Sequence, residues 1–104
     1  MRSTTIRGGV SVTESVHKAG KMIRVVLVSE EGRIRDLSIS GDFFTVPYTG
    51  ALEKFEGGLV GSRLMREQHT VRVRKGLVEA GLIIIGASPD DFVEAIMKAA
   101  PINE

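Results

Sequence analysis

The residues in this chain whose types could do chemistry are few and scattered. The 104-residue sequence has no cysteine and two histidines, His17 and His69. Without cysteine there is no thiol nucleophile, thiolate metal ligand or disulfide, which fits a reducing compartment. His17 falls in a predicted turn and His69 on a charged helical segment, and neither stands beside a nucleophile or a second metal ligand. Both histidines are therefore expected to be exposed to solvent.

Phosphate-binding motifs are also missing from the sequence. The pattern Gly-x-x-x-x-Gly-Lys-Ser/Thr does not occur. Glycine pairs stand at Gly8-Gly9 and Gly57-Gly58, but neither pair follows a strand and opens a helix. Flexibility and backbone packing are their expected roles. The sequence identifies no catalytic set of its own.

Three polar side chains remain as candidates for contact with a ligand or a partner. Asp42 follows a strand-like segment, where it is expected to form an Asx-type turn, to cap the segment after the strand, or to hold a loop near a ligand or partner. Lys18 and Lys21 flank Ala19-Gly20 just before the clearest strand. A lysine on a turn either is solvated or meets a phosphate or a carboxylate. The residues alone leave these alternatives open.

The most informative segment is Ile39–Phe44, which ends a strand-like run. Three of the five aromatic residues, Phe43, Phe44 and Tyr48, fall within six positions here. Because neighbouring side chains of an extended chain point to opposite faces, Phe43 and Phe44 cannot both fill one core while the strand lasts. The chain must turn sharply at Gly41-Asp42, or another element or another protein must cover the second face.

Size and charge narrow the class of protein. The length suits one domain, and 42% apolar with 26% charged residues is typical of a globular one. Lysine plus arginine number 14 and aspartate plus glutamate 13, so no strong overall field attracts nucleic acid or an anionic membrane. The apolar runs are far shorter than the roughly 20 residues of a membrane helix, and the N-terminus does not read as a signal peptide. We expect a cytoplasmic protein with neither nucleic-acid nor membrane partners.

The hydrophobic pattern predicts a β-hairpin after an N-terminal arm. Residues 1–16 are expected to be an arm, either disordered or an edge strand, ahead of a single domain at residues 17–104. Met22–Val28 is apolar on nearly every position, which predicts a central strand covered on both faces. Arg33–Ser40 predicts the returning strand, with a bulge near Asp36 where the apolar positions change phase.

Three helices are predicted to follow the hairpin. The first comes after Pro47, with Thr49 as its N-cap. Its apolar face is formed by Leu52, Phe55 and Leu59. The second is expected within Ser62–Ala80. Its apolar pattern consists of Leu64, Val71 and Val78, which are seven positions apart, with Val73 and Leu77 alongside. The third starts at Ser88, where a serine N-cap precedes a proline and two aspartates.

A short β-branched run between glycines, Leu82–Gly86, predicts a buried third strand. The fold class expected from the sequence is therefore α+β. Its small, mainly antiparallel sheet would consist of the hairpin at residues 22–40 plus the strand at 82–86, packed with about three helices.

Several short motifs, taken together, resemble the accessory domain of lipoate–protein ligases. The matching segments are Gly20–Val25, Gly32–Ile34, Ile39–Phe44, Pro47, Leu52-Glu53, Leu59, Gly61 and Ile85–Phe92. The resemblance covers residues 17–100, and the order and spacing of the glycines and of Gly-Asp-Phe-Phe make it fairly specific. In many bacterial ligases this domain is the C-terminal part of one chain, whereas in several archaea it is a separate small protein that partners a catalytic subunit. This chain resembles the stand-alone archaeal form.

The resemblance implies a helper role in protein lipoylation. In this family a catalytic subunit uses ATP and magnesium to convert lipoate to lipoyl-adenylate, then transfers the lipoyl group to a lysine of a lipoyl-acceptor domain. The accessory domain carries no catalytic groups but is needed for adenylation. The implied protein binds no cofactor alone, forms a cytoplasmic heterodimer with the catalytic subunit, and meets the acceptor domain indirectly. Three ways of assisting adenylation stay open, namely ordering a loop of the ligase, closing its site or stabilising its fold, and loop ordering is our working hypothesis.

Under this resemblance, the residues near the partner or ligand share one segment before the central strand and one after the hairpin. They are Lys18, Gly20, Lys21, Gly41, Asp42, Phe43 and Phe44. One phenylalanine would fill the domain's core while the other packs on the ligase or on a loop near the adenylate. Two other classes stay open: a homodimeric small-molecule-sensing or regulatory domain, and an independent enzyme with an unrecognised site.

Overall fold

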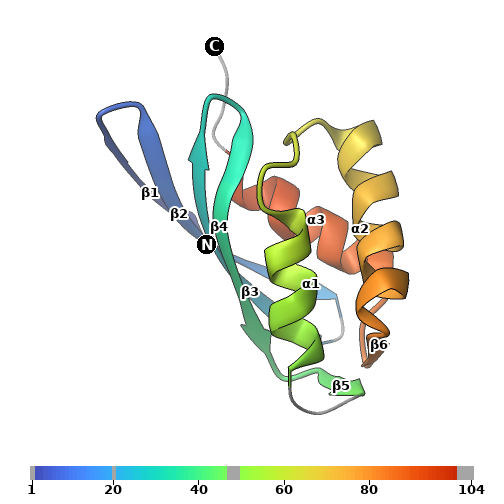
Figure 1. Ribbon diagram of the computed structural model, residues 1–104. Coiled ribbons are helices and arrows are strands. Elements are labelled where there is room, and N and C mark those ends of the chain that lie inside the picture. The colour runs from blue at the N-terminus through green and yellow to red at the C-terminus, as the bar shows by residue number, and fades with distance from the viewer. Residues whose placement is uncertain (1, 20, 47–49, 101–104) are drawn as a thin grey trace.

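The computed structural model describes residues 2–19, 21–46 and 50–100. Its elements, in chain order, are β1 (Arg2–Arg7), β2 (Val10–Ala19), β3 (Lys21–Glu30), β4 (Arg33–Gly41), β5 (Phe44–Val46), α1 (Ala51–Leu59), α2 (Arg66–Ala80), β6 (Ile83–Ile85) and α3 (Pro89–Ala99) (Figure 1). The first four strands form one antiparallel sheet in the order β1-β2-β3-β4, the main sheet. Strands β5 and β6 form a separate antiparallel pair, the ribbon. The predicted α+β class is confirmed.

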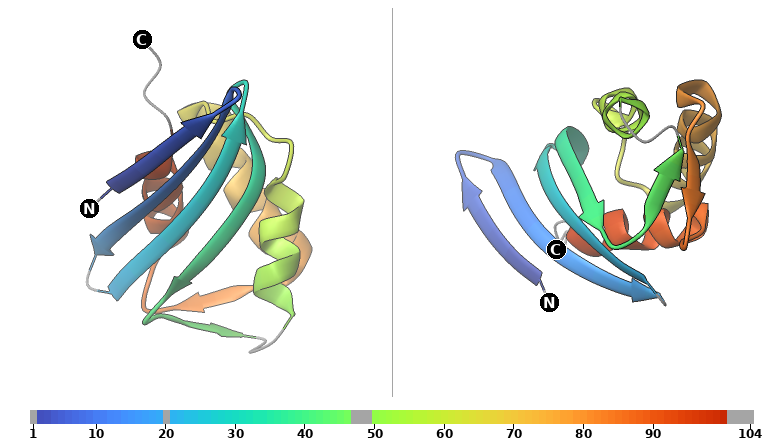
Figure 2. Two further views of the ribbon diagram at one scale, coloured as in Figure 1. Left: turned by 90° about the vertical axis from the view of Figure 1, so that its left-hand side faces the viewer. Right: turned by 90° about the horizontal axis from the view of Figure 1, so that it is seen from below.

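The helices cover one face of the main sheet and leave the other open (Figure 2). Helix α3 packs on β2 and β3, α1 packs on β4, and α2 packs against α1 and α3. Because side chains alternate along a strand, Ile23, Val25 and Leu27 of β3 point inward and are fully buried. Met22 and Arg24 on the other face are exposed. The prediction that this strand is covered on both faces was wrong.

The N-terminal segment is part of the main sheet, which corresponds to the edge-strand alternative predicted for residues 1–16 rather than to the disordered arm. Strand β1 forms its edge, and β2 runs through residue 17, where the domain was expected to begin. Gly8 and Gly9 join the two strands with φ values of 61° and 83°, a conformation that suits a tight hairpin turn.

The inward positions of β2 explain why the sequence concealed this strand. They are occupied by small polar residues, Ser11, Thr13 and Ser15, which are buried under α3. The hydroxyls of Thr13 and Thr4 are 3.1 Å apart, and Ser15 donates to the carbonyl oxygen of Ala95 at 3.3 Å. These hydrogen bonds satisfy polar groups at positions where an apolar residue would have indicated a strand.

The predicted hairpin and its bulge are both confirmed. The register between β3 and β4 shifts after Val28, because Val28 pairs with Asp36 and Ser29 pairs with Ile34. Arg35 is the extra residue of the bulge. The shift returns Ile34 to the inner face, where it is buried with the rest of the core.

Helix α1 agrees with the sequence, and α2 agrees in part. In α1, Phe55 and Leu59 are buried and Leu52 packs against the core; Pro47 and the expected N-cap Thr49 lie outside the described residues. In α2, Val73 and Leu77 of the predicted apolar pattern are buried, together with His69 and Gly76. Val71 and Val78 of the same pattern are exposed. These two residues, seven positions apart, share one side of the helix, and that side faces solvent.

The strand predicted at 82–86 exists as β6, but it is neither buried nor part of the main sheet. It pairs with β5, and two of its three isoleucines are exposed. The predicted start of α3 is confirmed: the backbone N–H of Asp91 donates to Ser88 Oγ at 3.1 Å, and the N–H of Ser88 donates to Asp91 Oδ2 at 2.9 Å. No helix within residues 50–100 has the length or apolar composition to cross a bilayer.

Candidate protein-interaction site

The end of β4 is a tight junction where the chain leaves the main sheet for the ribbon. Asp42 Oδ1 accepts a hydrogen bond from the backbone N–H of Met22 at 2.6 Å, and the N–H of Asp42 donates to the carbonyl oxygen of Met22 at 3.2 Å. Asp42 therefore closes the end of the β3–β4 ladder through the neighbouring strand, which differs from the expected Asx-type turn. A Cβ at Gly41 would overlap the Met22 carbonyl oxygen and lie 2.9 Å from Phe43 Cε1, so this position requires glycine.

Phe43 and Phe44 diverge at this junction. The ring of Phe43 packs edge-on against Phe92, with 5.1 Å between centroids and 67° between planes. Phe92 is fully buried and also contacts Phe55, 6.0 Å away between centroids. Phe44 is 61% exposed. The prediction that the two rings cannot share one core is confirmed, and Phe43 is the ring that joins it.

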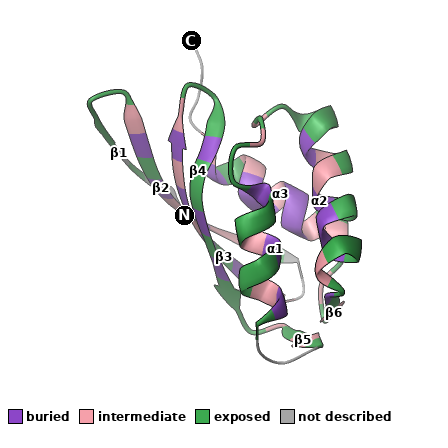
Figure 3. Cartoon of the chain, viewed as in Figure 1, coloured by how far each residue is buried: buried purple, intermediate pink, exposed green. Residues whose placement is uncertain are grey.

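The outer side of the ribbon is an apolar surface, which we call the ribbon face. Phe44 pairs with Ile85 and Val46 with Ile83, so these four side chains share one side of the strand pair. Their exposed fractions are 61% for Phe44, 46% for Val46, 61% for Ile83 and 51% for Ile85. Figure 3 colours much of β5 as exposed. Solvated faces of antiparallel strands are normally polar. Four large apolar side chains on such a face are typical of an interaction site.

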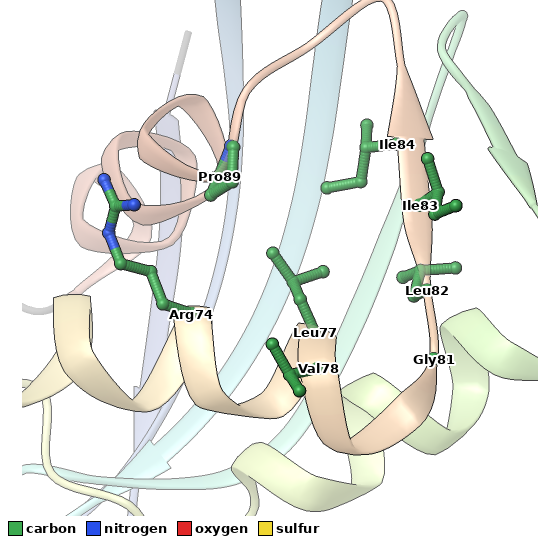
Figure 4. Close-up of a pocket in the computed structure, with 8 residues that line it drawn as sticks. All are labelled: Arg74, Leu77, Val78, Gly81, Leu82, Ile83, Ile84 and Pro89. Carbon is green, nitrogen blue, oxygen red and sulfur yellow. The ribbon is translucent and has the colours of Figure 1, made fainter.

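A groove of about 590 Å³ adjoins the ribbon face (Figure 4). It runs between α2, the segment 81–84 and the start of α3. Its walls are Arg74, Leu77, Val78, Gly81, Leu82, Ile83, Ile84 and Pro89. Ile83 belongs to both the groove and the ribbon face, so the two are continuous. At the other end, Arg74 Nη2 lies 2.6 Å from Asp90 Oδ1.

The two candidate lysines lie at the same end of the main sheet, where β2 ends and β3 begins. The stem of Lys21 packs on the backbone of Gly86, where an added Cβ would be 3.0 Å from Lys21 Cγ. This contact brings Lys21 to the end of β6. Lys18 is exposed on β2, opposite Met22. Gly20 lies outside the described residues.

The sequence did not identify the groove or the β6 half of the ribbon face. Val78 and the β6 isoleucines were assigned to the core on their hydrophobicity alone. One sequence signal could have indicated this surface. Three consecutive isoleucines at 83–85, with no polar residue between them, stand in a short strand close to Val78.

Both histidines differ from the expectation of solvent exposure. His17 lies on the inner side of β2, half-buried, with Nε2 3.7 Å from Asp91 Oδ1. His69 is fully buried in α2, and its ring nitrogens have no hydrogen-bond partner among the described residues. Burial, with a smaller contribution from Arg66, lowers the pKa of His69 to about 4, so its imidazole is neutral at pH 7.

Metal-binding geometry is not found within residues 2–19, 21–46 and 50–100: no three His, Asp or Glu side chains are placed to hold one ion. The carboxyl group of Asp91 serves the α3 cap, and the hydrogen bond from the Ser88 backbone holds the pKa of that carboxyl below its usual value. The candidate site in the described residues is therefore an apolar contact surface, formed by the ribbon face and the groove, with Lys21 beside it.

Comparison with known proteins agrees with this picture of a small α+β accessory fold. No family model matches the chain. A curated relative, lipoate-protein ligase A subunit 2 of Thermoplasma acidophilum, is 35% identical over 75 residues. The aligned region covers 72% of this chain and 76% of the relative.

A solved structure gives the same result in three dimensions. It comes from a structural analysis of an archaeal lipoylation system, a bipartite lipoate protein ligase and its E2 lipoyl domain from Thermoplasma acidophilum. The match has a TM-score of 0.69 at 31% identity and covers 92% of this chain and 97% of the other. The expected resemblance is confirmed, and the chain belongs to the family of lipoate–protein ligase A subunit 2.

Proposed function

We propose that this chain is the non-catalytic accessory subunit of a two-subunit lipoate–protein ligase. It works with a separate catalytic subunit in ATP-dependent activation of lipoate, and the complex acts in the cytoplasm. The observation that carries the proposal is the 35% identity to a protein named as the second subunit of this ligase, over 76% of its length. The apolar ribbon face supports it, because an obligate partner needs a surface on which to bind.

The reaction assigned to the complex proceeds in two steps. The lipoate carboxylate attacks the α-phosphorus of ATP, which forms lipoyl-adenylate and releases pyrophosphate with its magnesium. A lysine amine of the acceptor domain then attacks the acyl carbon, which forms an amide, expels AMP and releases a proton. In this proposal all reacting groups outside the substrates belong to the catalytic subunit.

The accessory subunit acts on the first step through differential contacts. If it binds the adenylation-competent form of the catalytic subunit more tightly than other forms, it raises the population of that form. By linkage, lipoate and ATP then tighten the complex by the same factor. Calorimetric titration with and without these substrates measures this coupling, and identical affinities would contradict it.

The proposed function is tested by measuring pyrophosphate release from ATP. The catalytic subunit from the same organism is assayed with lipoate, with and without this chain. Release is expected to depend on this chain and to saturate at one chain per catalytic subunit. Transfer from preformed lipoyl-adenylate to the acceptor domain serves as the control, because it bypasses adenylation. Equal pyrophosphate release with and without this chain would refute the accessory role.

A further inference from the structure

We propose that the ribbon face and the adjoining groove form one docking surface for the catalytic subunit. The partner is expected to present an apolar segment over the ribbon, an apolar side chain in the groove, and carboxylates at the margin. This inference rests on the proposed function and assigns a surface to it.

Continuity is the first argument for a single surface. Ile83 is half of the Val46–Ile83 pair on the ribbon and also a wall of the groove. Val78, on the last turn of α2, is a further wall of the groove and is exposed. One partner segment that crosses Ile83 therefore contacts both features.

Composition is the second argument. The inner residues of the ribbon, Thr45 and Ile84, are half-buried, and Ile84 packs against the core. Packing of the ribbon on its own domain thus uses one side of each strand. The four outer side chains are not part of the hydrophobic core. Packing of the domain therefore does not explain why all four are large and apolar. Removal from water on binding a partner does explain them.

Shape favours a protein over a small molecule. A small-molecule site encloses most of its ligand. Here the groove is open, and the ribbon face extends beyond it over four side chains of two strands. A surface of this form matches protein interfaces, in which a few central apolar anchors fill pockets and supply most of the affinity.

Charge at the margin selects the chemistry of the partner. Lys21 at the end of β6 and Lys75 on α2 have no ion pair within the described residues. The carboxylates near them already have partners: Asp90 pairs with Arg74, Glu79 pairs with Arg72, and Asp42 accepts the backbone N–H of Met22. A second copy of this chain would bring the same unpaired lysines into a shared interface, opposite carboxylates that are engaged within their own chain. A partner with acidic residues around its apolar segment is complementary.

The test uses Ile83→Thr, Ile85→Thr and their combination, because threonine keeps a β-branched side chain suited to a strand. The matched control is Ile6→Thr, an exposed isoleucine on β1 at the opposite end of the main sheet. Affinity for the catalytic subunit is measured by calorimetric titration, and thermal unfolding confirms that each variant folds. The double variant is expected to bind at least 10-fold more weakly, with the control within 2-fold of wild type.

A charge variant tests the acidic margin separately. Lys21→Glu is expected to weaken binding several-fold and to reduce the dependence of the association rate on salt, whereas Lys98→Glu, on an exposed turn of α3, changes neither. A Lys21→Glu complex as tight as wild type would overturn the acidic part of the inference.

The outcomes separate this inference from the proposed function. If wild type stimulates pyrophosphate release and the folded double variant binds and stimulates equally well, the docking surface is wrong and the function stands. If wild type neither binds nor stimulates, both fail. Sedimentation showing that the isolated chain forms a dimer that Ile83→Thr dissociates would also overturn the inference, because the surface would then belong to a second copy.

Discussion

The two sheets of this molecule each turn one side toward solvent, and the two sides are built differently. On the main sheet, the outer side mixes valines, including the directly paired Val12 and Val28, with polar groups: Glu14 of β2 forms an ion pair with Arg24 of β3, and Ser38 and Ser40 of β4 lie beside them. On the ribbon, all four outward side chains are large and apolar. Apolar side chains are therefore exposed on the outer side of both sheets, but on the ribbon face no polar side chain stands among them.

Under the proposed docking surface, the outer side of the main sheet stays in contact with water, whereas the ribbon face is covered by the catalytic subunit. Scattered apolar side chains on a solvated face are ordinary and need no explanation. An apolar cluster without polar neighbours is costly to expose and favours association. If this difference is correct, substitutions in the core and at the junction should lower the free energy of unfolding, and substitutions on the ribbon face should weaken binding to the catalytic subunit.

The largest expected effect concerns His69, which is buried in α2 and whose ring nitrogens have no hydrogen-bond partner in the part of the chain that the structure describes. Its folded pKa of about 4 lies below the ordinary 6.5, so the unfolded chain binds a proton that the folded chain does not. Stability is complete above pH 6.5 and falls as the pH drops toward 4, by about 3 kcal/mol. Urea unfolding from pH 7 to 4 should show this loss in wild type. The His69→Leu variant should lack that component; an unchanged profile would mean that the imidazole is not sealed from water.

The next effect lies at the junction that separates the two sheets. Gly41→Ala places a methyl group against the Met22 carbonyl oxygen and the Phe43 ring, and should destabilise the fold by about 2–3 kcal/mol. The control is Gly57→Ala in α1, where no atom lies within 4 Å of the new methyl. That change should stabilise the fold by up to about 1 kcal/mol, because alanine favours a helix. Equal effects on denaturant midpoints would contradict the packed junction.

Adjacent phenylalanines give the most direct test of the comparison. Phe43→Ala removes a ring packed on Phe92 and should cost about 2 kcal/mol, less than a fully buried ring because Phe43 is half-buried. Phe44→Ala removes an exposed ring and should change stability by about 0.5 kcal/mol or less, while weakening binding to the catalytic subunit. Thermal unfolding measures the stability of both variants, and calorimetric titration measures their affinity for the catalytic subunit. A large stability loss in Phe44→Ala would show that the ribbon face serves the fold.

The smallest effect belongs to the outer side of the main sheet. The Glu14–Arg24 ion pair is exposed, so a double-mutant cycle to alanine should give a coupling of about 0.5 kcal/mol or less, reduced further by salt. Binding to the catalytic subunit should not change in either variant. A variant of this pair that weakened binding as much as Ile83→Thr would remove the distinction between the two surfaces.

Local patterns predicted those features whose physics is local. The β3–β4 hairpin and its bulge follow from alternation and its change of phase near Asp36. The start of α3 follows from the Ser88 capping sequence, which needs only neighbouring residues to form its hydrogen bonds. The divergence of Phe43 and Phe44 follows from the geometry of an extended chain.

Other features were mispredicted because apolar character alone does not say what covers a residue. The serines and threonine that β2 turns inward hid a strand that α3 buries. In α2 the predicted apolar pattern did not separate the exposed Val71 and Val78 from the buried Val73 and Leu77, and the buried His69 was expected to be exposed.

The amino-acid sequence by itself determined the family, the α+β class, the central hairpin and the requirement that two adjacent rings part. Those properties depend on composition, on short-range geometry and on the spacing of glycines. Only the tertiary structure decided that β5 and β6 leave the main sheet, that their outer sides and the groove become one apolar surface, and that Lys21 reaches it. Such placements arise from contacts between Lys21 and Gly86 or Phe44 and Ile85, which lie far apart along the chain. No local preference encodes them, because the free energy that selects them comes from burial shared across the whole fold.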